Sequence, residues 1–277
     1  MQRKIETTQK GRVLHKFVAS SVDGQDEHLP DSDSDSEDLD LSIPLQGQMF
    51  CADEQIIPFK RKSALKCYNP KKHKWGYKLF ALCDVYGTVY NSDVYTGKIV
   101  PKPYHRDIGA SGNIVLQLSN IISSDQTYLL YFDHWFSLPL LFVELYKRGI
   151  GAIGTIRLPR FPGCAFTSNA NLKKKGRGTY EEKESAIENV NIRTIKWFDN
   201  RGVILATTFS SAEPLRKTER WDKNEKKKVA IQKPYAVDIY NKFMGGVDLL
   251  DGQLAYYRIY VRLKKYYMRF FYHFIDK

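Results

Sequence analysis

Four aspartates combine a residue type and a spacing that suit metal-dependent chemistry. Asp248 and Asp251 lie three residues apart in GGVDLLD, directly behind a pair of glycines. On a helix, that spacing places both carboxylates on one face, where they can address one cation. Asp53 and Asp133 end apolar, strand-like runs far upstream, in MFCADEQIIPF and YLLYFDHWF. The pattern predicts a site built from two strand acids and one helical segment.

Such a ligand set suits a site that binds two Mg²⁺ ions and cleaves phosphodiesters. Hard cations take oxygen ligands, and a metal pair flanks the scissile phosphate. We therefore expect the carboxylates of Asp53, Asp133 and Asp248 to converge on two ions roughly 4 Å apart. Each aspartate taken singly has another interpretation, because isolated aspartates commonly cap helices or form turns.

The elements that must position these acids are predicted by the hydrophobic pattern. Alternating apolar and polar residues with a glycine-containing turn predict strands and a hairpin. Apolar residues at helical spacing predict helices. In chain order the pattern predicts strands within 48–59 and 75–90, a helix over 111–122, a strand over 127–133, a helix over 137–149 and a strand over 151–157. This order indicates an α/β protein whose mixed sheet carries helices on its faces.

The rest of the chain divides by composition. Residues 1–45 are rich in acids and serines with almost no large apolar residues, which predicts a disordered acidic arm. Residues 46–157 form the first part of the core. Residues 158–234 break into glycine, proline, lysine and short strands, which indicates a mostly β insertion subdomain. Residues 235–277 are expected to be the helical end of the core, broken near Gly245 and Gly246.

Charge indicates a polyanionic partner. The formal net charge is +12, yet there is no Lys or Arg between Phe17 and Phe59, where eleven acids occur. From Lys60 onward, 38 Lys and Arg face 19 Asp and Glu. A basic body of this kind attracts nucleic acid, although scattered lysines that merely keep a domain soluble remain an equal alternative.

Other function classes are not favoured. No apolar run approaches the ~18 residues of a membrane span, so a soluble, intracellular protein without membrane contact is expected. The four cysteines form no CxxC pair and no Cys/His ladder, which argues against a disulfide framework or a zinc site. They are Cys51, Cys67, Cys83 and Cys164.

The candidate DNA-contacting residues are cations in three clusters. Contact with backbone phosphates is one interpretation and a solvated polar rim the other. The first cluster is interleaved with aromatic residues, the second lies in KKKGRG and could equally serve as a nuclear-import signal, and the third forms one predicted helical stripe at i, i+4, i+7 and i+11. They comprise Lys60, Arg61, Lys62, Lys66, Lys71, Lys72 and Lys74; Lys173, Lys174, Lys175 and Arg177; and Arg258, Arg262, Lys265 and Arg269.

Beyond these patterns, the sequence resembles the piggyBac family of transposases and their domesticated derivatives. The resemblance runs from about Gln48 to the last residue and rests on several motifs in order. They read ADEQIIPFK, HKWGYKLFALCD, VYTGK, YFDHWF, GTIR, KKKGRG, KWFDN and YNKFMGGVDLLD followed by YRI.

The resemblance implies an RNase H-like fold interrupted by an insertion, with a DDD site that uses two Mg²⁺ ions to cut and join DNA. The family pattern points to Asp53, Asp133 and Asp248 as metal ligands and to Asp251 as an accessory catalytic acid. Asp84 also ends a strand, but it is better explained as the start of a hairpin turn.

Departures from the family pattern also matter. The family usually reads DNWFTS where this chain has DHWFSL, so His134 replaces an asparagine and one residue is missing after Phe136. A deletion at a helix start rotates the rest of the helix by about 100° unless the turn absorbs it. His134 either adds a ligand or faces solvent, and the second interpretation is favoured. The chain also lacks the family's extended N-terminal part and zinc module, so weak recognition of transposon ends is expected.

Together these features predict the core of a nuclear DNA transposase that acts at TTAA-type sites, as a degenerate or domesticated copy. The alternative is a DNA- or chromatin-binding protein that keeps the fold without the chemistry. The expected partner is double-stranded DNA, with a possible homodimer and no small-molecule substrate.

Overall fold

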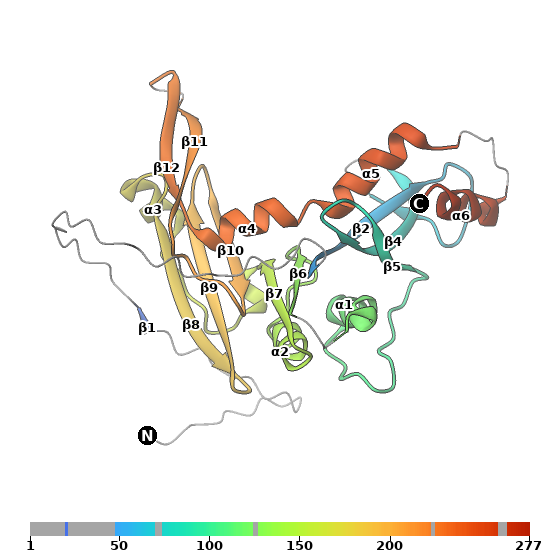
Figure 1. Ribbon diagram of the computed structural model, residues 1–277, viewed down its shortest axis with the longest axis horizontal. Helices are drawn as coiled ribbons and strands as arrows, with labels where there is room; N and C mark the ends of the chain where they lie inside the picture. Colours follow the sequence, from blue (N-terminus) through green and yellow to red (C-terminus); the bar gives the residue numbers. More distant parts are fainter. Residues whose placement is uncertain (1–19, 22–47, 70–73, 124–126, 223–224, 260–264) are drawn as a thin grey trace.

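A computed structural model describes residues 20–21, 48–69, 74–123, 127–222, 225–259 and 265–277 (Figure 1). Its centre is a mixed sheet. Four strands occupy the middle in the order β4, β2, β6 and β7, and β5 pairs with the outer side of β4. Their bounds are β2 (Met49–Pro58), β4 (Trp75–Asp84), β5 (Val89–Val94), β6 (Tyr128–Phe132) and β7 (Ile150–Thr155).

Strand direction within this sheet is mixed. β2, β6 and β7 run parallel, whereas β4 pairs antiparallel with β2 and forms a hairpin with β5. Further strands extend both edges, with β10, β9, β8 and β1 beyond β7, and β3 beside β4. These are β1 (Ser20–Ser21), β3 (Cys67–Tyr68), β8 (Tyr180–Ile187), β9 (Val190–Phe198) and β10 (Gly202–Thr207).

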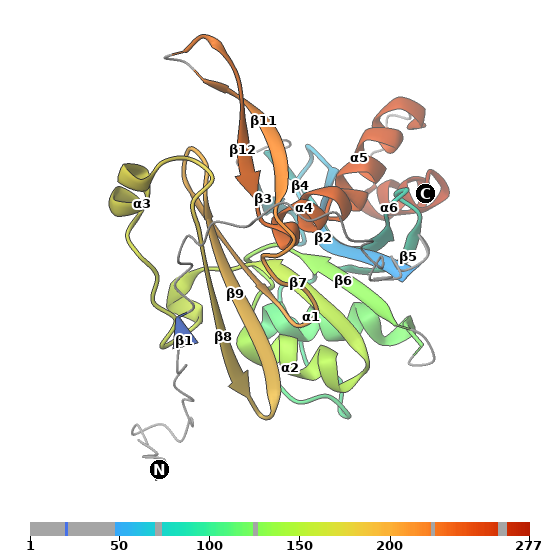
Figure 2. The same ribbon diagram turned by 60° about the vertical axis from the view of Figure 1, so that its left-hand side comes forward.

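Helices cover both faces of the central strands (Figures 1 and 2). One face carries α1 (Ala110–Leu118), which continues into the 3₁₀ turn η2 (Ser119–Ile121), and α2 (Pro139–Lys147). The other face carries α4 (Tyr235–Phe243) and α5 (Gly246–Tyr257). The remaining helical elements are η3 (Leu158–Arg160), α3 (Asn169–Lys175) and α6 (Tyr266–Ile275).

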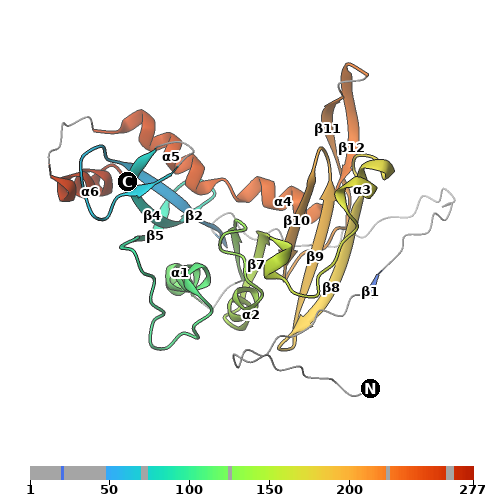
Figure 3. The same ribbon diagram turned by 180° about the vertical axis from the view of Figure 1, so that it is seen from behind.

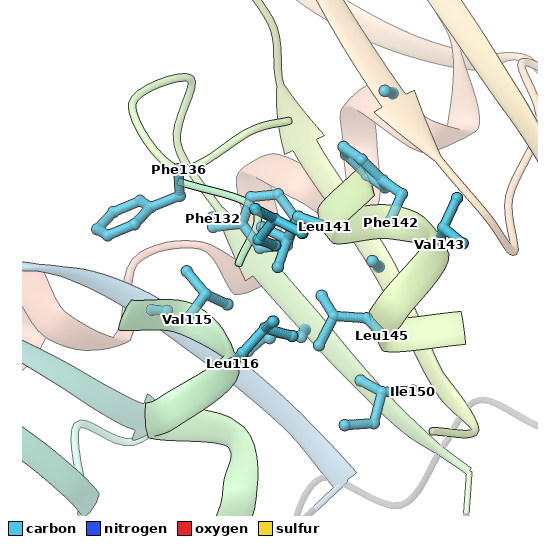
Figure 4. Close-up of a cluster of buried hydrophobic side chains, with 14 of the residues drawn as sticks. Val115, Leu116, Phe132, Phe136, Leu141, Phe142, Val143, Leu145 and Ile150 are labelled. Atoms are coloured by element: carbon cyan, nitrogen blue, oxygen red, sulfur yellow. The ribbon is translucent and has the colours of Figure 1, made fainter. Parts of the chain in front are cut away.

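The core between the sheet and the pair α1–α2 is a dense apolar cluster (Figure 4). Val115 and Leu116 of α1, Phe132 of β6, and Leu141 and Leu145 of α2 are all fully buried. Burying one such side chain contributes about 1.5–3 kcal/mol. This cluster fixes the end of β6, where Asp133 is the next residue.

A second apolar cluster lies between the sheet and the helices α4 and α5. The glycine at position 246 allows α5 to pack closely against the strands. A Cβ on Gly246 would stand 2.1 Å from the carbonyl oxygen of Asp84 and 2.7 Å from Cys51 Sγ. Any larger residue at this first position of α5 would push the helix away from β2 and β4. Val247 and Leu250 complete the buried contact, so α5 lies directly against the strand that carries Asp53.

The described elements agree with much of the predicted order. The strands and the helices within 111–122 and 137–149 are present, and the helical region is broken between α4 and α5 as predicted. The mixed α/β sheet with helices on its faces is confirmed. None of the helices in the described ranges is long and apolar enough to cross a membrane.

The region predicted as an insertion is mostly β. Its strands β8–β10 join the central sheet through the antiparallel pairing of β10 with β7. Strands β11 (Arg216–Asp222) and β12 (Lys227–Lys233) instead form a separate two-stranded ribbon that projects from the rest of the chain (Figure 3). Of the predicted acidic arm, only Ser20–Ser21 belongs to the described residues, as the strand β1 beside β8. Its disorder and the domain boundaries stay predictions.

Candidate active site

Asp53 lies within β2 on the side that faces α5. Burial raises the pKa of its carboxyl from 3.8 to about 7, and the negative charges of Asp133, Glu54 and Asp248 add to that shift. The backbone N–H of Glu54 donates to Asp53 Oδ1 at 2.7 Å and offsets part of it. The carboxylates of Asp133 and Asp248 are therefore close enough for their charges to act on Asp53.

Asp133 is the residue directly after the end of β6. Ala52 and Phe132 are register partners in the parallel pair β2–β6, so the next residues along the two strands are Asp53 and Asp133. The backbone N–H of Trp135 donates to Asp133 Oδ1 at 2.7 Å. The hydroxyl of Ser137 donates to the Asp133 carbonyl at 3.0 Å. Sheet register and a closed turn together place the second acid beside the first.

The third acid comes from the opposite direction, on a helix. Asp248 lies in the first turn of α5, and Asp251 lies one turn later. The side-chain amide of Gln55 donates to Asp251 Oδ1 at 2.8 Å. A carboxylate in the first turn is also favoured by the helix dipole. Strand β2 therefore contacts α5 at two points along the helix: at Gly246, which lies close to Cys51, and at Asp251, which accepts from Gln55.

These acids do not form a preassembled cluster. Among the described residues, no group of three His, Cys, Asp or Glu side chains is placed to hold a metal ion. The predicted convergence on a metal pair thus stays a prediction. The donor set itself suits Mg²⁺, since it consists of carboxylate oxygens. Burial is the main cause of the raised pKa of Asp53, and the neighbouring carboxylates add a repulsion that a cation would relieve.

The raised pKa of Asp53 predicts a pH-dependent gain in stability for Asp53→Asn. The folded chain holds this proton more tightly than the unfolded chain, so the stability that Asp53 contributes is complete below about pH 4 and is lost as the pH rises through about 7. In metal-free buffer, we expect Asp53→Asn to melt above the parent protein at pH 8 and close to it at pH 4. The melting temperatures are measured by circular dichroism during thermal unfolding. A variant that melts below the parent protein at pH 8 would contradict the raised pKa of Asp53.

Tyr240 is a site residue that sequence reasoning missed. It lies on α4, and its hydroxyl donates to the carbonyl of Phe132 at 3.3 Å. Burial raises the pKa of this phenol, and the charges of Asp133 and Asp53 raise it further. Its position eight residues before Asp248, in YNKFMGGVD, is a weak sequence signal. The neutral phenol bonds to the last residue of β6, next to Asp133.

His134 does have neighbours, contrary to the expectation of a side chain that simply faces solvent. Its Nδ1 lies 3.6 Å from Asp133 Oδ2, and Nη2 of Arg157 lies 2.5 Å from its Nε2. Arg160 donates to the carbonyls of His134 at 3.2 Å and Trp135 at 2.5 Å. This segment is therefore a closed turn held by two arginines.

This turn is also packed. The Trp135 ring stacks on Phe80 with centroids 5.5 Å apart, and Lys78 Nζ lies 4.5 Å from the Trp135 ring while pairing with Glu54 at 2.5 Å. Helix α2 begins only at Pro139. Residues 133–138 thus lie between β6 and α2 and are not part of the helix.

Asp84 is a turn residue, as predicted. Its Oδ1 accepts from the backbone N–H groups of Tyr86 and Thr88, each at 2.9 Å. These bonds close the hairpin between β4 and β5.

The first predicted basic cluster forms an exposed surface. Lys60, Arg61, Lys62 and Lys74 are exposed beside the rings of Tyr68 and Trp75, which are 56% and 49% exposed and 5.0 Å apart. We call these six residues the Lys60–Trp75 patch. Lys66 instead lies over the Trp75 ring and donates to the carbonyl of Arg61 at 3.0 Å. Lys71 and Lys72 lie outside the described residues.

The single helical stripe predicted for Arg258, Arg262, Lys265 and Arg269 is wrong. Helix α5 ends at Tyr257 and α6 begins at Tyr266, and the backbones of Arg258 and Lys265 are extended. A change in backbone direction breaks the helical spacing on which the stripe depends. Arg269 donates from Nε to the carbonyl of Pro58 at 3.2 Å, so it also anchors α6 to β2. Arg262 lies outside the described residues.

The KKKGRG cluster divides into two kinds of residue. Lys173, Lys174 and Lys175 are exposed in the last turn of α3. Arg177 is half-buried and donates from Nε to Asp199 at 2.7 Å. The first three are open to a polyanion, whereas Arg177 serves an internal ion pair.

The chain is similar to known transposases and transposon-derived proteins. The family described as "Transposase IS4" matches residues 45–277. The human PiggyBac transposable element-derived protein 3 is 31% identical over 221 residues, which cover 79% of this chain and 37% of that protein. The chain belongs to the piggyBac family of transposases and transposable element-derived proteins.

Two further comparisons agree with this membership. The human PiggyBac transposable element-derived protein 2 is 26% identical over 79% of this chain and 37% of its own length. A piggyBac transposase, solved by cryo-EM in a synaptic complex with hairpin DNA, superposes with a TM-score of 0.62 at 19% identity. That match covers 84% of this chain and 45% of the transposase, and it confirms the RNase H-like fold. The match spans 37% of each of the two human proteins and 45% of the solved transposase, which is less than half of each.

Proposed function

We propose that this chain is the core of a piggyBac-type transposase, as a degenerate or domesticated copy, whose family activity is metal-dependent cleavage and strand transfer at TTAA-type sites. The observation that supports the proposal most is the placement of three aspartates. The register of β2 and β6 sets Asp53 beside Asp133, and α5 packs against β2 with Asp248 in its first turn. The charges of Asp133 and Asp248 both act on Asp53. These are the ligand types that two-metal phosphoryl transfer requires.

Asp53, Asp133 and Asp248 would hold two Mg²⁺ ions. When bound, such ions lower the pKa of the attacking hydroxyl or water and stabilise the leaving oxygen. The chain's own part is positional. β2 and β6 carry Asp53 and Asp133 at neighbouring positions of adjacent strands, α5 carries Asp248 against β2, and Tyr240 bonds to the carbonyl of the residue before Asp133. Because Asp53 must lose its proton to bind a cation, metal affinity should rise with pH up to about 8.

The proposed partner is double-stranded DNA in the nucleus. The Lys60–Trp75 patch combines exposed cations with exposed rings, which suits contact with phosphates and bases. The solved piggyBac transposase is in a synaptic complex with hairpin DNA, which supports a DNA partner for this chain. The homodimer stays a prediction.

The alternative is a DNA- or chromatin-binding protein derived from a transposase that no longer cuts. His134 favours it, because this side chain links Asp133 to Arg157 and so adds a contact beside the second acid. An imidazole beside Asp133 would compete with a metal ion for its carboxylate.

The test is nicking of a TTAA-flanked duplex by the purified chain in Mn²⁺ or Mg²⁺. We expect metal-dependent nicking at most, with excision undetectable in cells, because the closed turn at His134 restrains Asp133. Binding of duplex DNA without any nicking would favour the alternative. Robust TTAA-specific excision would show that the shortened turn does no harm.

A further inference from the structure

One buried amide joins two helices that are far from it in the sequence. Gln55 lies on β2, two residues beyond Asp53, and is only 1% exposed. Its Nε2 donates to Asp251 Oδ1 of α5 at 2.8 Å. Its Oε1 lies 3.0 Å from Nε2 of His273 on α6. The separation in sequence is 196 residues for the first contact and 218 for the second.

The chemistry of the two partners fixes the direction of both bonds. An ionised carboxylate only accepts, so the amide must turn its NH₂ group toward Asp251. Its oxygen then needs a donor, which His273 supplies from Nε2–H. Burial lowers the pKa of His273 to about 3, with help from the charges of Lys277, Arg258 and Arg269, so the ring is neutral. A neutral ring that donates from Nε2 locks the orientation of the amide.

This contact matters because it lies away from the point where α5 comes closest to the sheet. The closest approach is at Gly246, and the Gln55 contact is made one and a half turns further on. Two separated contacts fix the rotation of a helix about its axis, whereas one does not. The rotation of α5 decides where the carboxylate of Asp248 points.

We propose that Gln55 is a positioning residue for α5, which holds Asp251, and through it Asp248, in place relative to Asp53 on the neighbouring part of the same strand. His273 supports it by fixing the amide. The role in metal binding rests on the proposed function; the role in holding α5 does not. Residues that orient ligands in this way typically change metal affinity by about 10–100-fold when replaced.

The test compares Gln55→Met with Gln55→Ala. Methionine has nearly the volume of glutamine but makes neither hydrogen bond, so it separates the hydrogen bonds from packing. The matched control is Gln117→Met, because Gln117 of α1 makes a similar bond from Nε2 to Asp93 Oδ2 at 2.6 Å, away from α5. Two measurements are made on the full chain: amide hydrogen exchange across α5, and Mn²⁺ affinity by electron paramagnetic resonance.

We expect both Gln55 variants to speed exchange in α5 about tenfold and to weaken Mn²⁺ binding about tenfold or more, while the Gln117 control changes neither. Unchanged exchange in α5 for Gln55→Met would overturn the proposal. If the parent chain binds no Mn²⁺ at all, the proposed function fails, and the exchange experiment still decides the role of Gln55. If Gln55→Ala fails to fold, Gln55→Met carries the test alone.

Discussion

Replacement of Asp53, Asp133 or Asp248 by asparagine is expected to lower Mn²⁺-dependent nicking at least about a thousandfold. Metal ions supply several kcal/mol of transition-state stabilisation, and each 1.36 kcal/mol is a factor of ten in rate. Asparagine keeps the size and one oxygen of each side chain but removes the charge that binds a divalent cation. The measurement is single-turnover nicking of a TTAA-flanked duplex.

The pattern across the four acids is more informative than any single loss. Asp251→Asn keeps an oxygen that can accept from Gln55, so we expect a smaller loss of about 10–100-fold. Asp93→Asn is the control, because Asp93 is tied to Gln117 of α1 and not to α5. DNA binding should persist in all four site variants, since each removes a negative charge. If Asp248→Asn and the Asp93→Asn control nick DNA equally well, Asp248 and its helix α5 are not part of the active site.

The sequence predicted the helical position of Asp248 and Asp251 and the strand-end position of Asp133, because spacing and the length of an apolar run are local properties. The strand-end position expected for Asp53 is wrong, since this residue lies in the middle of the ten-residue strand β2. The turn role of Asp84 was equally predictable, because the glycine in the hairpin is visible in the sequence. These features require no knowledge of tertiary contacts.

The features that the sequence did not predict depend on contacts across the fold. Gln55 is one polar residue within a strand, and only the packing of α5 and α6 on β2 gives it two partners. The break between Tyr257 and Tyr266 was missed because the aromatic and basic residues there keep a helical spacing in the sequence. Helix α6 packs against β4, where the Phe270 and Tyr77 ring centroids are 4.6 Å apart, and it bonds to the end of β2 through Arg269 and Pro58. These tertiary contacts outweigh the local helical preference.

Several of the basic residues make contacts within the chain and are therefore less available to DNA. Arg269 and Lys66 bond to backbone carbonyls, and Lys78 pairs with Glu54. A count of cations therefore overstates the surface offered to DNA. The Lys60–Trp75 patch remains exposed after these residues are set aside, and it is the part of the chain on which the DNA proposal can be tested most directly.

Duplex DNA affinity is expected to fall steeply with salt and to depend on this patch. If about six phosphates are contacted, affinity should drop on the order of a thousandfold between about 50 and 200 mM salt, because each contact releases condensed counterions. The double variant Arg61→Ala with Lys62→Ala should weaken binding to all sequences alike and flatten the slope of log affinity against log salt by up to about two units.

The charge-matched control is Lys98→Ala with Lys102→Ala, two exposed lysines in the segment before α1. Both double variants lower the net charge equally, so a general electrostatic attraction would affect them equally. A local contact surface would not: only the Arg61 and Lys62 variant should change the slope. Fluorescence anisotropy across a salt series measures this. Identical slopes for the two double variants would exclude the Lys60–Trp75 patch as the DNA contact, and salt-insensitive binding would argue against nucleic acid as the partner of this basic body.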